Sequence, residues 1–159
     1  MKLKVLMVCL GNICRSPLAE GILKAKANPD LIFVDSAGTA GYHVGSPPDP
    51  RSIAIGRKYH IDITSQRCRK FMKDDFADFD LILAMDKENY HDICALAPTE
   101  KDRQKVRLIL EGAGLAFTEV PDPYYGGENG FEQVYQMLDK ACDTLLKEQL
   151  LPRLINHGK

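Results

Sequence analysis

Apolar residues along this chain are concentrated in a few short continuous runs, which polar and turn-forming residues separate. The first run covers residues 3–9 (LKVLMVC), and similar runs cover 31–38, 78–86 and 106–110. Continuous apolar runs of this length are typical of strands that are buried on both faces of a parallel sheet. The pattern therefore predicts a strand over each of these ranges.

Helix signals lie between the predicted strands. Ser16 and Pro17 are typical of a helix start, with serine as the cap, and a helical period follows up to Asn28. We expect further helices over 51–60 and over 130–151, the second with one apolar face. Strands that alternate with helices predict an α/β fold, a single-domain doubly wound, four-stranded parallel sheet with helices on both faces. Such sheets bind ligands outside the carboxyl ends of their strands.

Length and composition are those of an ordinary globular domain. The chain has 159 residues, of which 45% are hydrophobic and 27% charged, and its formal net charge is -1. We therefore expect one domain over residues 1–159, with the last few residues disordered. A net charge this small creates no general attraction to nucleic acid or anionic membranes, so we expect neither as a partner.

The cysteines and the start of the chain bear on location. The five cysteines fit neither a disulfide framework nor a zinc site, so we expect reduced thiols. The first apolar run ends at Gly11 without a cleavage site of small residues, and no later segment reaches membrane-spanning length. These features predict a cytoplasmic protein.

An unusual turn follows the first predicted strand. Cys9 and Arg15 have a Cys-x5-Arg spacing that arises by chance in roughly one of four chains of this composition, so its context matters more than the spacing. Gly11 and Asn12 suit a tight loop with positive φ, and the loop runs directly into a predicted helix start. Backbone N–H groups that converge at a helix N-terminus predict an anion site that fits a phosphate group.

Cys9 and Arg15 have the chemistry that a phosphate site can use. A guanidinium group holds two phosphate oxygens at once, and the same positive field favours a thiolate, so we expect Cys9 to be a nucleophile. The alternative for Cys9 is a small buried residue that ends a strand. For Ser16 the alternatives are a helix cap and a hydroxyl group that bonds to the Cys9 sulfur.

Asp122 is the candidate proton donor. It lies between Pro121 and Pro123 in the segment EVPDPYYGG, and a carboxyl group on a stiff loop can protonate a leaving alkoxide or phenoxide. The alternative is a simple turn, since Asp-Pro often starts one. Asp86, at the end of the third predicted strand, could orient Arg15 or cap the next helix. The histidines are expected to be surface or packing residues, namely His43, His60, His91 and His157.

Four segments carry a resemblance to a known family. They are VCLGNICRSP near the start, DSAGT at 35–39, FDLILAMD at 79–86 and VPDPYYGG at 120–127. Together they resemble the low-molecular-weight protein tyrosine phosphatases over nearly the whole chain. The resemblance implies that Cys9 attacks phosphorus, Arg15 binds the phosphate, and Asp122 protonates the tyrosyl oxygen and later activates water. A phosphocysteine intermediate forms, and neither a metal nor another cofactor is required.

The resemblance also assigns residues around the nucleophile. It implies a network in which Ser36 supports Asn12, with Gln66 where the family has a histidine. Cys14 matches a second cysteine that protects the nucleophile through a reversible disulfide, and the alternative for it is loop packing. The phosphate-binding loop is expected to comprise Leu10, Gly11, Asn12, Ile13, Cys14 and Ser16.

Three tyrosines are expected at the substrate cleft. Tyr42 and Tyr124 match the two walls between which the aromatic ring of the substrate fits, and Tyr125 follows directly. The implied partner is a protein or peptide that contains phosphotyrosine. Kinases phosphorylate positions that match Tyr124 and Tyr125 in some family members, so a tyrosine kinase is a second candidate partner.

Other functions use a similar loop. A thioredoxin-coupled arsenate reductase needs further cysteines where this chain has Leu81 and Glu88, and a phosphoarginine phosphatase carries threonine at the position of Ile13. A phosphotransfer protein would keep its phosphocysteine, whereas Asp122 favours turnover. A phosphotyrosine-binding module without catalysis would need neither Cys9 nor Asp122.

Overall fold

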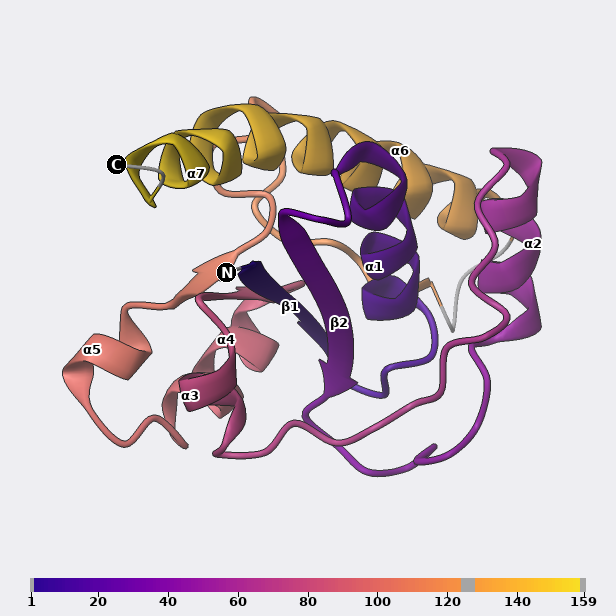
Figure 1. Ribbon diagram of the computed structural model, residues 1–159. Coiled ribbons are helices and arrows are strands. Elements are labelled where there is room, and N and C mark those ends of the chain that lie inside the picture. Colours follow the sequence, from indigo (N-terminus) through magenta and orange to yellow (C-terminus); the bar gives the residue numbers. More distant parts are fainter. Residues whose placement is uncertain (1, 124–127, 158–159) are drawn as a thin grey trace.

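Parallel strands form the sheet at the centre of the computed structural model, which describes residues 2–123 and 128–157 (Figure 1). The four strands have the order β2-β1-β3-β4, and they are β1 (Leu3–Cys9), β2 (Ile32–Gly38), β3 (Leu81–Ala84) and β4 (Val106–Leu108). The predicted doubly wound parallel sheet is confirmed. The chain runs from β1 outward to β2 and then crosses back over β1 to β3, so the strand order reverses at β1. Ligands of such folds bind at this reversal, at the carboxyl end of β1.

Helices cover both faces of this sheet (Figure 1). The helical segments are α1 (Arg15–Lys26), α2 (Pro50–Lys58), α3 (Asp75–Asp78), α4 (Lys87–Cys94), α5 (Glu100–Arg103), α6 (Glu128–Leu145), the π-helical η2 (Leu146–Leu150) and α7 (Leu151–His157). Within the described ranges, no helix has both the length and the apolar composition needed to cross a membrane.

The element boundaries differ from the prediction mainly in the third strand and the last helix, and the fourth strand ends at Leu108 rather than at residue 110. The third strand is shorter than 78–86, because Phe79 N–H still bonds to Asp75 of α3 and Asp80 accepts from the N–H of Lys4. The last helix does not end at residue 151, since η2 carries it into α7. No ranges were predicted for the short helices α3, α4 and α5. Asp86 caps α4 by accepting from the Asn89 N–H, which confirms the alternative that it caps the next helix.

Alternate residues of β1 contribute to two separate cores. Val5 and Met7 pack in a cluster that includes residues of α1 and α6, whereas Leu6 and Val8 pack in a cluster that includes residues of α3 and α4. All four of these side chains are completely buried. Burial of a side chain of this size stabilises the fold by about 1.5–3 kcal/mol, so the central strand is firmly held.

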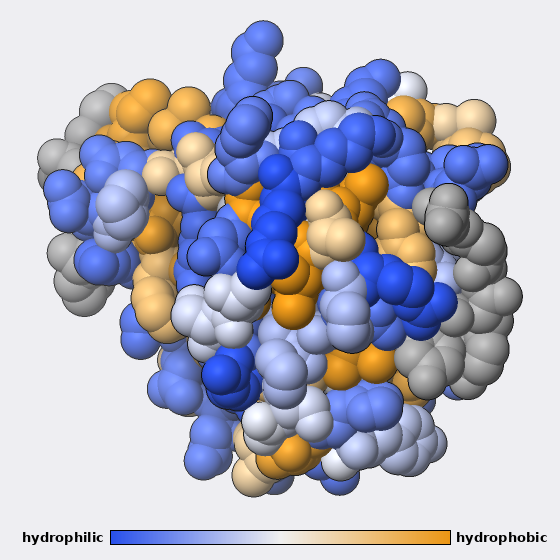
Figure 2. All heavy atoms as spheres, turned by 90° about the vertical axis from the view of Figure 1, so that its right-hand side faces the viewer, coloured by the Kyte–Doolittle hydropathy of each residue, from blue (hydrophilic) through white to orange (hydrophobic). Residues whose placement is uncertain are grey.

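Helix α2 is held against α6 by an aromatic and polar contact. The rings of Tyr59 and Tyr135 stack with 3.9 Å between centroids, and the Tyr59 hydroxyl donates to Glu132 at 2.7 Å. Lys58 forms an ion pair with the same carboxylate. On the face that carries α2, polar side chains cover most of the surface and apolar ones are visible mainly in recesses between them (Figure 2). The contact of Tyr59 and Lys58 with α6 thus holds α2, whose Ser52 hydroxyl donates to the carbonyl of Cys14 in the loop after β1.

Gly38, the last residue of β2, lies directly against the loop that follows β1. The segment 69–71 pairs with it, because Gly38 N–H donates to Arg69 and its carbonyl accepts from Phe71. A Cβ atom at this position would lie 2.8 Å from the Leu10 oxygen and 3.0 Å from the Asn12 nitrogen. Since both are backbone atoms, only glycine allows this approach.

We predict that Gly38→Ala lowers the free energy of unfolding by about 1–3 kcal/mol, because the added methyl group forces the loop away from β2. Urea unfolding measures this loss. Gly41→Ala is the matched control, since its methyl group would meet only the Lys70 and Val44 side chains, at 3.6 and 3.8 Å. An equal effect of both substitutions would contradict the prediction.

Candidate active site

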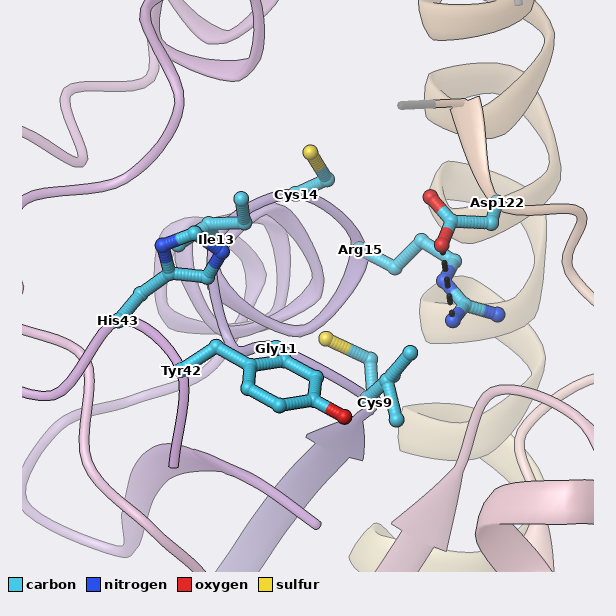
Figure 3. A pocket seen from close by; sticks show the side chains of 9 residues that line it. Cys9, Gly11, Ile13, Cys14, Arg15, Tyr42, His43 and Asp122 are labelled. Atoms are coloured by element: carbon cyan, nitrogen blue, oxygen red, sulfur yellow. Dashed lines mark ion pairs between the residues drawn. The ribbon is translucent and has the colours of Figure 1, made fainter. Parts of the chain in front are cut away.

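A cavity of about 300 Å³ opens at the carboxyl end of β1. Figure 3 shows Tyr42 and His43 on one side, Arg15 and Asp122 on the other, and the Cys9 thiol between them. The structure thus brings together the predicted nucleophile, anion-binding arginine and proton donor. The lining residues are Cys9, Leu10, Gly11, Ile13, Cys14, Arg15, Tyr42, His43 and Asp122.

Residues 9–15, here called the phosphate loop, have their carbonyl groups held on the outside. Three of them accept from backbone N–H groups: Cys9 from Thr39, Leu10 from Ala40, and Ile13 from Asp49. Two accept from side chains: Asn12 from the Cys68 thiol, and Cys14 from the Ser52 hydroxyl. None of the described peptide bonds is cis. In a trans peptide, the N–H of the next residue points away from the carbonyl.

Each of these carbonyls shares a peptide group with the N–H of the next residue. These N–H groups belong to residues that line the cavity, namely Leu10, Gly11, Ile13, Cys14 and Arg15. They point away from the donors that hold the carbonyls, and therefore toward the cavity. Converging backbone N–H groups of this kind bind anions. The start of α1 at Arg15 adds the partial positive charge of a helix N-terminus.

Asn12 has a different role in this loop. It adopts a left-handed backbone with φ of 56°, and its N–H donates to Cys9 Sγ at 3.3 Å. Its buried side chain donates to the hydroxyl groups of Ser16 at 2.8 Å and Ser36 at 3.0 Å, and accepts from Arg69 N–H at 3.0 Å. These bonds hold the loop in a conformation that few residues adopt.

Ser16 lies beside Cys9, the predicted nucleophile. Its predicted role as a helix cap is wrong, because α1 begins at Arg15 and Cys14 occupies the cap position. The Ser16 hydroxyl lies 3.0 Å from Cys9 Sγ and 3.4 Å from the Ala37 carbonyl oxygen. Since it accepts from Asn12, its own proton is available to the sulfur, where it can stabilise negative charge.

The Arg15 guanidinium is 97% buried, so its charge requires partners. It donates to Asp86 at 2.6 Å and to the Val120 carbonyl oxygen at 3.0 Å, and it lies 3.8 Å from Asp122. Burial alone would lower the pKa of Arg15, but Cys9, Asp86 and Asp122 together raise it. Asp86 has both of the roles that the sequence left open, because its other oxygen accepts from Asn89 N–H.

Cys14 is the second cysteine of the phosphate loop. Burial raises the pKa of the Cys14 thiol well above its ordinary value, and the charges of Asp49, Cys9 and Asp122 raise it further. Cys14 therefore keeps its proton at neutral pH. The five cysteines of the chain are free thiols in the structure. The predicted disulfide between Cys9 and Cys14 remains a prediction.

The support of Asn12 differs in part from the prediction. Ser36 lies where the resemblance implied, whereas Gln66 donates to the Pro17 carbonyl oxygen at 3.0 Å and has no described bond to Asn12 or Ser36. The adjacent residues Cys68 and Arg69 contact Asn12 instead. The buried carboxylate of Glu20, which the sequence analysis missed, accepts from Ser36 at 2.6 Å and from Lys24 at 2.5 Å. In the sequence, the only feature that indicates a role for Glu20 is its position one helical turn after Ser16, on the same side of the predicted helix.

Tyr42 and His43 lie at the mouth of the cavity. Tyr42 lines the cavity and is 76% exposed. His43 also lines it, which is compatible with its prediction as a surface or packing residue, and His60 and His91 are exposed as expected. Tyr124 and Tyr125 lie outside the described residues.

Among the described residues, no group of three or more metal-ligating side chains is arranged to hold a metal ion.

Comparisons with known proteins agree on one family. The family model for low molecular weight phosphotyrosine protein phosphatase matches residues 4–153. A Streptomyces coelicolor low molecular weight protein-tyrosine-phosphatase is 40% identical over 158 residues, covering 92% of this chain and 93% of its own. The crystal structure of a protein tyrosine phosphatase from Entamoeba histolytica has a TM-score of 0.90 and 38% identity, covering 96% and 99% of the two chains. Vibrio vulnificus Wzb, solved with benzylphosphonate, has a TM-score of 0.82 and 30% identity, covering 93% and 99%.

Glu20 gives the site a testable pH dependence of stability. Burial raises the pKa of Glu20, although hydrogen bonds from Lys24 and Ser36 act in the opposite direction. Its contribution to folding is therefore complete below its ordinary pKa of 4.5 and declines as the pH rises through the raised pKa of the folded state. In Glu20→Gln this contribution does not titrate.

We therefore predict that the free energy of unfolding of the wild type, relative to Glu20→Gln, decreases as the pH rises from about 4 to about 7. Urea unfolding of both proteins across this range measures the difference. A difference that stays constant or increases with pH would contradict the assignment of Glu20 as a buried titrating group.

Proposed function

The chain belongs to the low molecular weight phosphotyrosine protein phosphatase family, and we propose that Cys9, Arg15 and Asp122 carry out its hydrolysis of phosphotyrosine. Proteins of this family are phosphotyrosine phosphatases, and their mechanism depends on a cysteine. The observation that carries the residue assignment is the position of Cys9 Sγ. It lies next to the anion-binding N–H groups and the Arg15 side chain, with Asp122 across the cavity.

The first step forms a phosphocysteine. The non-bridging oxygens of the phosphate accept from the loop N–H groups and from Arg15, and the Cys9 thiolate attacks phosphorus. The bond between phosphorus and the tyrosyl oxygen breaks, and the leaving oxygen takes a proton from Asp122. Because the guanidinium is planar, Arg15 can keep two oxygens bound as the phosphoryl group becomes trigonal.

The second step releases phosphate. A water molecule attacks phosphorus, and the carboxylate of Asp122 takes one of its protons. The bond between sulfur and phosphorus breaks, so Cys9 leaves as a thiolate. The Ser16 hydroxyl at 3.0 Å and the Asn12 N–H at 3.3 Å stabilise the charge on that sulfur. Apart from the attacking water, every group in these two steps belongs to the chain or to the substrate.

An aryl group on the substrate suits the shape of the site. The mouth of the cavity carries the exposed ring of Tyr42, against which a phenyl ring can pack. Vibrio vulnificus Wzb was solved in complex with benzylphosphonate, in which a benzyl group is attached to phosphorus. We propose that the ring of phosphotyrosine lies between Tyr42 and the 120–127 segment, with Tyr124 and Tyr125 contributing to that wall.

The remaining assignments are also proposals. We propose that the whole chain forms one phosphatase domain, since the family model covers residues 4–153. We infer a reducing compartment such as the cytoplasm, because the mechanism needs a reduced Cys9 and all five cysteines are free thiols. A tyrosine kinase that modifies Tyr124 or Tyr125 is the proposed regulatory partner, and mass spectrometry of the protein from cells would identify such phosphorylation.

Replacement of the nucleophile tests the mechanism. Cys9→Ser should reduce hydrolysis of p-nitrophenyl phosphate by at least about 10³-fold, because a hydroxyl group is a much poorer nucleophile than a thiolate. Steady-state kinetics with phosphotyrosine, phosphoserine, phosphoarginine and arsenate would define the substrate class at the same time.

Cys142→Ser is the matched control for this substitution, since Cys142 is buried but lies on α6 outside the cavity. Its activity per folded molecule should stay within about twofold of the wild type. Turnover by Cys9→Ser at the rate of the control would exclude Cys9 as the nucleophile.

The leaving group tests the role of Asp122. Asp122→Ala should slow hydrolysis of phenyl phosphate by about 10²-fold or more, because phenoxide requires a proton as it leaves. Hydrolysis of p-nitrophenyl phosphate should decrease much less, since nitrophenoxide is a good leaving group without protonation. Equal losses in kcat/KM for the two substrates would show that Asp122 is not the acid.

A further inference from the structure

Cys68 contacts the phosphate loop from the side opposite the cavity. Its side chain is buried, with 4% exposure, and its thiol donates to the carbonyl oxygen of Asn12 at 2.7 Å. Cys68 does not line the cavity. In the mechanism proposed above this residue touches neither the substrate nor the reacting atoms, so any effect on catalysis must pass through its contact with Asn12.

The backbone of Cys68 holds a second part of the site. Its N–H donates to the Ser46 carbonyl at 2.8 Å, and its own carbonyl accepts from Gly45 N–H at 2.8 Å. The segment that contains Gly45 and Ser46 also carries Tyr42 and His43, which line the cavity. Cys68 therefore connects the phosphate loop with the segment at the cavity mouth.

The contact with Asn12 controls the orientation of one peptide group. The Asn12 carbonyl and the Ile13 N–H belong to the same trans peptide, so they point in opposite directions. When Cys68 holds the oxygen outside the loop, the Ile13 N–H points to the inside. The neighbouring carbonyls of Leu10 and Ile13 accept from backbone N–H groups, which no substitution other than proline removes. The Asn12 carbonyl accepts from the Cys68 side chain, so a substitution of Cys68 can remove this hydrogen bond.

The thiol is suited to a permanent role as a donor. Burial raises the pKa of Cys68 to about 11, and the charge of Cys9 contributes to this increase. Cys68 therefore stays protonated at neutral pH, and its proton remains available to the Asn12 oxygen. The two thiols thus have different functions, since a nucleophile must lose the proton that a donor keeps.

We propose that Cys68 is a positioning residue, whose thiol keeps the Ile13 N–H directed at the phosphoryl group. This inference rests on the proposed function, because it assigns the same N–H groups to phosphate. It extends the active site to a residue behind the loop. Its effect should be present in both phosphate binding and turnover.

Substitutions that remove or keep the donor test this role. In Cys68→Ala the Asn12 carbonyl loses its partner, and in Cys68→Ser a hydroxyl donor replaces the thiol. Isothermal titration calorimetry with inorganic phosphate measures the Kd, and p-nitrophenyl phosphate gives kcat and KM. We expect Cys68→Ala to increase the Kd about 5- to 10-fold and to lower kcat by a similar factor, with Cys68→Ser within about twofold of the wild type.

Two further variants separate positioning from packing. Cys68→Val fills the volume without a donor, so it should behave as Cys68→Ala does, and it replaces that variant if the smaller side chain does not fold. Cys142→Ala is the matched control, because Cys142 is completely buried and its sulfur lies 4.0 Å from the Ala19 carbonyl oxygen, away from the loop. It should lower the Tm and leave the Kd for phosphate unchanged.

The inference is overturned if the variants without a donor bind phosphate within twofold of the wild type, or if Cys68→Ser is no better than they are. Failure of the proposed function gives a different result. A wild-type protein that binds phosphate but does not hydrolyse p-nitrophenyl phosphate would refute the enzymatic mechanism, while the calorimetric comparison of the Cys68 variants would still be valid.

Discussion

The planarity of the peptide group is the constraint on which this active site depends. An N–H group can point at a bound anion only if the carbonyl in the same peptide points away from it, and that carbonyl then needs a donor of its own. The donors come from the end of β2, from the start of α2 and from Cys68. The phosphate loop is thus short in sequence but is held by segments from the first half of the chain.

The buried charge of Arg15 imposes a second constraint. A guanidinium without partners would be too costly to bury, and Asp86 and the Val120 carbonyl supply them from the segments after β3 and β4. The sheet order brings these segments together, because β3 lies beside β1 and β4 lies beside β3. Arg15, the residue proposed to bind phosphate, therefore also links the two halves of the sheet at its carboxyl end.

The sequence predicts the parts of this protein that depend on local patterns. The apolar runs predict the strands, and the residues from Cys9 to Arg15 predict an anion-binding loop at the end of the first one. The contacts around Asn12 are harder to predict, because the path of the irregular segment 66–70 decides that Cys68 and Arg69 contact it while Gln66 does not. Glu20 was missed for the same reason, since its role depends on what packs against it.

Gly38 pairs directly with Cys9 in the register of β1 and β2. A shift of this pairing by one or two residues in either direction would place Ser36, Ala37, Thr39 or Ala40 beneath the phosphate loop, and each of these residues has a Cβ atom where the backbone leaves no room. The loop can close only on a sheet whose strands are correctly aligned. The geometry of the catalytic centre therefore depends on the exact register of β1 and β2, because only a glycine opposite Cys9 leaves room for the loop.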